Sequence, residues 1–174
     1  MKALLIVDLQ NDFAKPGGAL YFPGAENVIS GIIKLVKEFK LQNLPIIYTK
    51  DWHEDKDYEF DIWGVHCLHD THGSEIVDEL KDTLYGYKHV YEVRKSRYSG
   101  FYGTNLEQIL KDLNITEVHV GGLVTHICVL FTVEELRNRG IETIVHSDCV
   151  DSFDKPMHEF ALREMKEVLL AKVI

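Results

Sequence analysis

Cys128 is the residue of this sequence that points most directly to covalent chemistry. It follows an apolar, β-branched run from Val118 to Val120, which predicts a buried strand, and then a glycine pair that frees the backbone to turn. From Val129 onward the apolar spacing is helical, so Cys128 is expected in the first turn of a helix. Unpaired N–H groups and the helix dipole favour negative charge there, which lowers the pKa of a thiol and favours a thiolate nucleophile. The alternative interpretation is a buried structural cysteine, the usual fate of a free thiol.

Ionisable side chains also follow three earlier runs that are predicted to be strands. Asp8 ends the first run, Asp51 and His53 follow the second, and Lys95 follows the third. Because the carboxyl ends of parallel strands meet at one edge of a sheet, we expect these side chains to converge with Cys128 in one pocket. Such a pocket would hold a nucleophilic thiol, a carboxylate and an ammonium group beside a possible metal site.

The pair Asp51 and His53 is also a candidate metal site. Two residues that are two apart on an extended segment lie on the same side, and His66 follows fifteen residues after Asp51. Carboxylate and imidazole ligands without a thiolate suit zinc, iron or manganese, and the sequence does not choose among them.

Strand-like and helix-like segments alternate along the whole chain, with no repeat or linker. This alternation predicts an α/β fold, a three-layer α/β/α sandwich with a mostly parallel, doubly wound, Rossmann-like sheet of five to six strands. A length of 174 residues fits a single domain over 1–174. The predicted strands are 3–7, 45–49, 89–93, 117–121, 141–146 and 170–174, and the predicted helices are 25–40, 73–82, 104–113, 127–139 and 155–168.

Composition and charge exclude several classes of function. The chain is 45% hydrophobic and 27% charged, as expected of a globular protein, and its net charge of −9 disfavours nucleic acid or an anionic membrane as a partner. No stretch approaches the length of a membrane span, and no signal peptide is expected. Three cysteines without framework spacing fit a reducing compartment, so we expect a cytoplasmic protein.

Five segments together resemble the motifs of the isochorismatase-like cysteine hydrolases, and within that family the nicotinamidases and N-carbamoylsarcosine amidases. The resemblance covers nearly the whole chain, and the motifs occur in the order and at the spacing found in that family. The segments are Val7–Phe13, Asp51–His53, Trp63–Cys67, Lys95–Phe101 and Gly122–Cys128.

The resemblance implies a catalytic triad of Asp8, Lys95 and Cys128. Asp8 would take the proton of the Cys128 thiol and later give it to the departing ammonia. Lys95 would supply positive charge that favours both the thiolate and the ionised carboxylate. The choice of Lys95 over its neighbours Arg94 and Arg97 depends on the family pattern.

The resemblance also implies the surroundings of the triad. A cis peptide bond would join Leu123 to Val124, and the backbone N–H groups of Val124 and Cys128 would donate to the developing oxyanion. Phe13 and Trp63 match aromatic residues that enclose the nicotinamide ring in nicotinamidases.

One divalent metal ion is implied beside the triad, bound by Asp51, His53 and His66. Glu59 falls where several family members place a fourth ligand. Zinc is the first expectation, and iron or manganese is the alternative. A homo-oligomer is also implied. The other histidines are expected to be loop, surface, structural or solvated residues: His69, His72, His89, His119, His126, His146 and His158.

The predicted activity is hydrolysis of the C–N bond of a small-molecule carboxamide through a thioester. Family members that cleave the vinyl ether of isochorismate lack the cysteine, so Cys128 favours an amide substrate. The best prediction is conversion of nicotinamide to nicotinate and ammonia. Two alternatives stay open: an amidase that acts on N-carbamoylsarcosine or another carbamoyl or ureido compound, and a non-catalytic α/β binding protein. A dinucleotide-binding protein is disfavoured because Asp8 to Phe13 contains no glycine.

Overall fold

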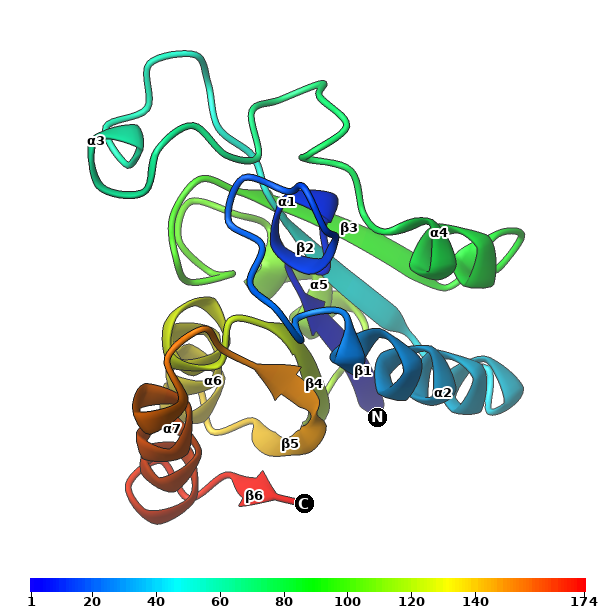
Figure 1. The fold of residues 1–174 in the computed structure, drawn as a ribbon. Coiled ribbons are helices and arrows are strands. Elements are labelled where there is room, and N and C mark those ends of the chain that lie inside the picture. Colours follow the sequence, from blue (N-terminus) through cyan, green and yellow to red (C-terminus); the bar gives the residue numbers. More distant parts are fainter.

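The computed structural model describes residues 1–174 and is built on one sheet of six parallel strands (Figure 1). The strands are β1 (Lys2–Val7), β2 (Ile46–Asp51), β3 (Val90–Lys95), β4 (Glu117–Leu123), β5 (Glu142–Asp151) and β6 (Lys172–Val173). Their order across the sheet is β3-β2-β1-β4-β5-β6, and every pairing is parallel. The α/β fold class predicted from the sequence is confirmed.

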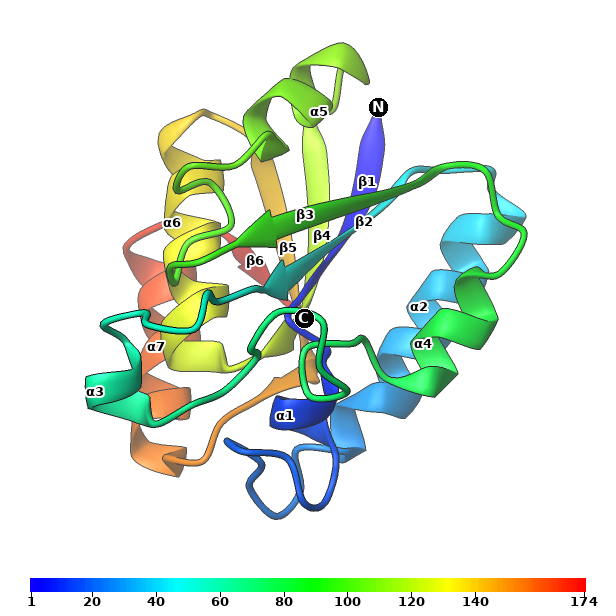
Figure 2. The ribbon, with the colours of Figure 1, turned by 90° about the horizontal axis from the view of Figure 1, so that it is seen from above.

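Helices cover both faces of the sheet, which gives three layers (Figure 2). The helices α2 (Asn27–Leu41) and α4 (Asp78–Leu84) pack on one face. The other face is covered by α5 (Leu106–Asp112), α6 (Leu130–Asn138) and α7 (Lys155–Glu167). Since both faces of the sheet are covered, β1 is a continuous apolar run whose residues 3–7 are fully buried.

The order of the strands reverses direction between β1 and β4, which are neighbours in the sheet. In doubly wound sheets the ligand crevice opens beyond the carboxyl ends of the strands at this point. The backbones approach closely there, because a Cβ atom on Gly122 would lie 2.0 Å from the carbonyl oxygen of Val7. Gly122 also has a φ of +127°, which glycine tolerates best, so this position in β4 requires glycine.

One predicted helix is wrong in its first half. The sequence predicted a helix over 73–82, but α4 begins at Asp78. Residues before it pair with the segment after β1 instead: Gln10 and Ile76 form an antiparallel bridge, and the Asn11 N–H donates to the Glu75 carbonyl at 2.9 Å. The backbone groups of this segment are therefore used in a contact between distant parts of the chain, and they are not free to form a helix.

Two short helices lie in the loops beyond the carboxyl ends of the strands: α1 (Asn11–Ala14) and α3 (Phe60–Trp63) (Figure 2). The sequence did not predict either of them. Five strands also end at other residues than predicted: β2 continues to Asp51, β3 to Lys95, β4 to Leu123 and β5 to Asp151, and β6 has only two residues. None of the helices combines the length and the apolar character that crossing a bilayer would require.

Candidate active site

Cys128 lies on the short π-helical turn η1 (Thr125–Val129), which joins β4 to α6. The sequence predicted an α-helix over 127–139 with Cys128 in its first turn, so the position is right and the type of turn is different. Two later segments hold this turn. His158 Nδ1 lies 2.9 Å from Thr125 Oγ1, and His126 Nδ1 lies 2.6 Å from Ser152 Oγ.

The Cys128 thiol is buried, and burial raises its pKa well above the ordinary value. The nearby ammonium of Lys95 acts in the opposite direction but does not outweigh burial. The lowered pKa that the sequence predicted for this thiol is therefore wrong, because the prediction considered the helix terminus and not the loss of solvent. At neutral pH the thiol keeps its proton until a neighbouring base accepts it.

That base is available in Asp8, which follows β1 with a left-handed φ of +48° and is fully buried. The Thr49 hydroxyl donates to Asp8 Oδ1 at 2.5 Å and accepts the Asp8 backbone N–H at 3.1 Å. Asp8 Oδ2 forms a buried ion pair with Lys95 Nζ at 2.7 Å. Burial raises the pKa of Asp8 despite the lysine, so this carboxylate is a better proton acceptor than an exposed aspartate.

Lys95 ends β3 and connects the acid, the thiol and the next cluster of side chains. Its Nζ lies 2.7 Å from Asp8 Oδ2, 3.1 Å from Asp51 Oδ1 and 3.6 Å from Cys128 Sγ. Burial opposes its charge, but Asp51 and Asp8 together raise the pKa of Lys95 well above its usual value. The structure thus brings the three residues of the predicted triad together around a charged lysine.

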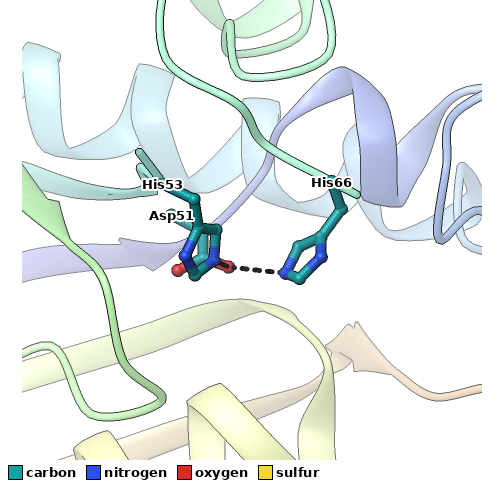
Figure 3. Close-up of side chains that lie close together, drawn as sticks. All are labelled: Asp51, His53 and His66. Carbon is teal, nitrogen blue, oxygen red and sulfur yellow. Dashed lines mark hydrogen bonds and ion pairs between the residues drawn. The ribbon is translucent and has the colours of Figure 1, made fainter. Parts of the chain in front are cut away.

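Asp51, His53 and His66 form the cluster that the sequence predicted as a metal site (Figure 3). All three are buried, and their candidate ligand atoms lie within 4.8 Å of one another. His53 Nε2 is 3.0 Å and His66 Nε2 is 3.4 Å from Asp51 Oδ2. Although burial disfavours the carboxylate, Lys95 and the two histidines hold the pKa of Asp51 below its usual range.

The other ring nitrogen of each histidine has an acceptor. His66 Nδ1 donates to the Gly64 carbonyl at 2.8 Å, and His53 Nδ1 faces Asp57 Oδ2 at 2.9 Å. Because these contacts hold a proton on Nδ1, Nε2 is the nitrogen of each histidine that would bind a metal ion. One carboxylate oxygen and two imidazole nitrogens suit a divalent transition metal, so these residues fit the group that the resemblance implies.

Glu59, the predicted fourth ligand, lies outside this cluster of three. It is 2% exposed and lines the cavity described below, and its Oε1 has no hydrogen-bond partner. Burial raises the pKa of Glu59, and the neighbouring charge of Asp51 adds to this effect. Arg97 Nη1 lies 3.6 Å from Glu59 Oε1, so this oxygen already has a cationic neighbour, and the role of Glu59 as a metal ligand stays a prediction.

A cavity of about 310 Å³ opens beside the triad and the cluster. It is lined mostly by apolar side chains, and Phe13 and Trp63 are both in its wall, as is Cys128. Neither a lysine nor an arginine lines it. Trp63 Nε1 donates to the Tyr98 hydroxyl at 3.2 Å, so Tyr98, which the sequence analysis did not single out, fixes the orientation of this wall.

Val124 also lines the cavity, directly before η1. The predicted cis peptide bond between Leu123 and Val124 is confirmed. The Val124 N–H donates to no group of the protein. It is therefore free for an acceptor in the cavity.

Six of the seven remaining histidines fall into three pairs. His69 lies in a loop beside Asp70 and His72 is exposed, as the sequence predicted. His119 Nδ1 lies 2.8 Å from His146 Nε2 within the sheet, a contact that the sequence did not predict. The contacts of His126 with Ser152 and of His158 with Thr125 were also missed, because partners so distant in sequence leave no local pattern.

Comparison with known proteins places this α/β structure in a family. A family model for the isochorismatase domain matches residues 2–174. The chain belongs to the isochorismatase family, and it is a hydrolase of the class that acts on non-peptide C–N bonds. The family and the enzyme class predicted from the sequence are confirmed.

Three solved structures show the range of similar enzymes. A nicotinamidase, PncA from Bacillus subtilis, has a TM-score of 0.93 at 34% identity over 99% of this chain and 98% of that chain. A pyrazinamidase of Pyrococcus horikoshii in complex with zinc has a TM-score of 0.90 at 31% identity, over 99% and 98% of the two chains. An N-carbamoylsarcosine amidase from Thermoplasma acidophilum has a TM-score of 0.86 at 34% identity, over 99% and 94%.

Proposed function

We propose that this chain is a metal-assisted cysteine amidohydrolase that converts nicotinamide to nicotinate and ammonia. The observation that carries the proposal is that Asp8 and Lys95 lie together beside Cys128, which lines an apolar cavity. Ligand binding alone does not require a buried acid, a charged lysine and a thiol to lie so close to one another. This arrangement therefore disfavours the non-catalytic alternative.

The first half of the reaction forms a thioester. Asp8 Oδ2 accepts the thiol proton, and Cys128 Sγ attacks the amide carbonyl carbon. The free N–H of Val124, together with that of Cys128, donates to the oxyanion that develops on the carbonyl oxygen. The tetrahedral intermediate collapses as Asp8 returns the proton to the amide nitrogen, and ammonia leaves.

The second half regenerates the thiol. Asp8 accepts a proton from a water molecule, and the resulting hydroxide attacks the thioester carbonyl carbon. The C–S bond breaks, the sulfur regains a proton, and the carboxylic acid product departs. Lys95 keeps its positive charge throughout and stabilises whichever of the carboxylate and the thiolate is ionised.

Asp51, His53 and His66 would hold one divalent metal ion, with zinc first and iron or manganese as alternatives, and Glu59 is the proposed fourth ligand. The zinc-bound pyrazinamidase of Pyrococcus horikoshii supports the choice of zinc. A bound divalent ion supplies Lewis acidity and a fixed point that orients a water molecule or a substrate atom.

The lining of the cavity supports a neutral aromatic amide over an N-carbamoyl amino acid. Phe13 and Trp63 offer aromatic surface for a flat ring. The carboxylate of N-carbamoylsarcosine would need a cationic partner, and no lysine or arginine lines the cavity. The runner-up function stays a carbamoyl or ureido amidohydrolase, supported by the similar amidase of Thermoplasma acidophilum.

Ammonia release from nicotinamide and from N-carbamoylsarcosine, measured side by side with zinc-loaded enzyme, tests the proposal. We expect turnover of nicotinamide and little or none of N-carbamoylsarcosine. The reverse preference would favour the runner-up, and turnover of neither compound would contradict both assignments. We further propose that the protein is a cytoplasmic homo-oligomer, which sedimentation of the purified protein and fractionation of cells would test.

A further inference from the structure

The loop after β2 contains a buried carboxylate that the proposed mechanism does not use. The Asp57 side chain is only 7% exposed, although its neighbours Asp55 and Lys56 are exposed. Withdrawing a carboxylate from water is costly unless hydrogen-bond partners compensate for it. The partners of Asp57 therefore show what this residue does.

Both oxygens of Asp57 are occupied. Oδ2 receives His53 Nδ1 at 2.9 Å and Arg97 Nη1 at 2.8 Å. Oδ1 accepts the Glu59 backbone N–H at 3.0 Å and lies 3.1 Å from Arg97 Nη1. One carboxylate thus connects a candidate metal ligand, the backbone of Glu59 and an arginine from another loop.

The contact between Asp57 and His53 determines which nitrogen of the imidazole faces Asp51. With Nδ1 held against Asp57 Oδ2, the ring turns Nε2 toward Asp51 Oδ2, 3.0 Å away, so that the nitrogen and the oxygen face the same point. A carboxylate in this position fixes both the tautomer and the orientation of a ligand histidine and makes it a stronger ligand.

Arg97 holds Asp57 from the segment after β3. It lies two residues beyond Lys95, its guanidinium is 4.2 Å from the Tyr58 ring centroid, and its Nη1 is 3.6 Å from Glu59 Oε1. The ion pair between Asp57 and Arg97 therefore joins the loop that carries His53 to the strand that carries Lys95.

We propose that Asp57, held by Arg97, is a positioning residue that fixes His53 as an Nε2 metal ligand and sets its loop against the strand of Lys95. This inference rests on the proposed function, because it assumes that a divalent metal binds at Asp51 and the two histidines. Neither residue touches the reacting atoms in the proposed mechanism.

Zinc affinity of the metal-free protein, measured by competition with a chromophoric chelator, tests the inference without relying on activity. Loss of the acceptor in Asp57→Ala is expected to weaken zinc binding by roughly 10- to 100-fold. Asp57→Asn keeps an acceptor oxygen for Nδ1–H but loses the charge, so its loss is expected to be smaller. Asp61→Asn is the matched control, because Asp61 is an exposed acid of the same loop.

Wild-type zinc affinity in both Asp57 variants would overturn the inference. Circular dichroism checks the fold, and if Asp57→Ala does not fold, Asp57→Asn and Arg97→Lys decide, since both are expected to show partial loss. Nicotinamide hydrolysis by the zinc-loaded wild type is measured on the same preparation. If the wild type hydrolyses nicotinamide but the variants bind zinc as the wild type does, only this inference fails. If the variants bind zinc more weakly but the wild type does not hydrolyse nicotinamide, only the proposed function fails.

Discussion

The reactivity of Cys128 depends on its neighbours and not on the thiol alone. Burial keeps the sulfur protonated, and the Asp8 carboxylate and the Lys95 ammonium lie beside it within the same buried group. Cys149 is buried as well, and burial together with Asp148 raises its pKa to about 12, but no lysine or aspartate of the site is near it. The two cysteines therefore form a natural pair for comparison.

We expect iodoacetamide to alkylate Cys128 before Cys67 or Cys149, since Cys128 alone of the three lines the cavity. Cys128→Ser should lower kcat by roughly a thousandfold or more, as removal of a nucleophile does elsewhere. Peptide mapping by mass spectrometry and steady-state assays measure the two effects. Cys149→Ser is the control and should keep its activity; prior labelling of Cys67 would count against this assignment.

Asp8 and Lys95 should behave as one unit with the nucleophile, because Asp8 Oδ2 and Lys95 Nζ are 2.7 Å apart and both side chains are buried. Asp8→Asn and Lys95→Met are each expected to abolish nearly all turnover, and the double variant should be scarcely worse than either single one. The test is a double-mutant cycle on kcat/KM. Losses that simply multiply would show that one of the two residues serves substrate binding or folding instead.

At the scale of the elements, the sequence predicts the site well where the site depends on strand ends. Asp8, Asp51 and Lys95 each end or follow an apolar run, and parallel strands bring such positions together. The metal cluster was predictable for the same reason, with help from the family pattern for His66.

Contacts between loops at the edge of the sheet are poorly predicted from the sequence. Asp57 and Arg97 are 40 residues apart, and nothing local in either segment indicates that they pair. The segment before α4 reads as helix from its own spacing, yet its backbone pairs with the residues after β1. The local spacing of apolar residues indicates which face of a segment is buried, but it does not indicate which distant segment pairs with it.

The close approach of β1 and β4 predicts an unusually costly glycine substitution. Gly122→Ala should destabilise the fold by roughly 3 kcal/mol or more, because the new Cβ meets the Val7 backbone and the positive φ is also strained. Urea denaturation measures the change. Gly86→Ala is the matched control: its φ is +72°, but its Cβ would meet nothing within 4 Å, so only the conformational strain applies. Equal losses in the two variants would contradict the steric explanation.

At the scale of the whole molecule, stability should depend on pH through His146, a half-buried histidine of β5 outside the candidate site. Burial lowers the pKa of His146, and the neighbouring His119 lowers it further, so the folded protein protonates this histidine less readily than the unfolded chain does. Below a pH of about 6.5 the unfolded chain binds a proton that the folded protein does not, and this contribution to stability falls as the pH falls.

The wild type should lose free energy of unfolding as the pH falls from about 7.5 to 5.5, and His146→Gln should make this loss smaller. Chemical denaturation of the metal-free protein at a series of pH values gives the slopes. The same substitution at His72, an exposed histidine, should leave the slope as it is in the wild type. If the free energy of unfolding of His146→Gln changes with pH as it does in the wild type, His146 does not contribute to the pH dependence.

The turn that carries the nucleophile also has a consequence for the order in which the enzyme becomes competent during translation. Its supports, Ser152 and His158, follow Cys128 by 24 and 30 residues, and both belong to the last quarter of the chain. A nascent chain on the ribosome thus acquires the acid, the lysine and the thiol before it acquires the groups that hold the thiol in place. We expect the cysteine to remain an ordinary thiol until Ser152 and His158 have also been synthesised and have packed against the turn, so that premature chemistry on the emerging polypeptide is avoided.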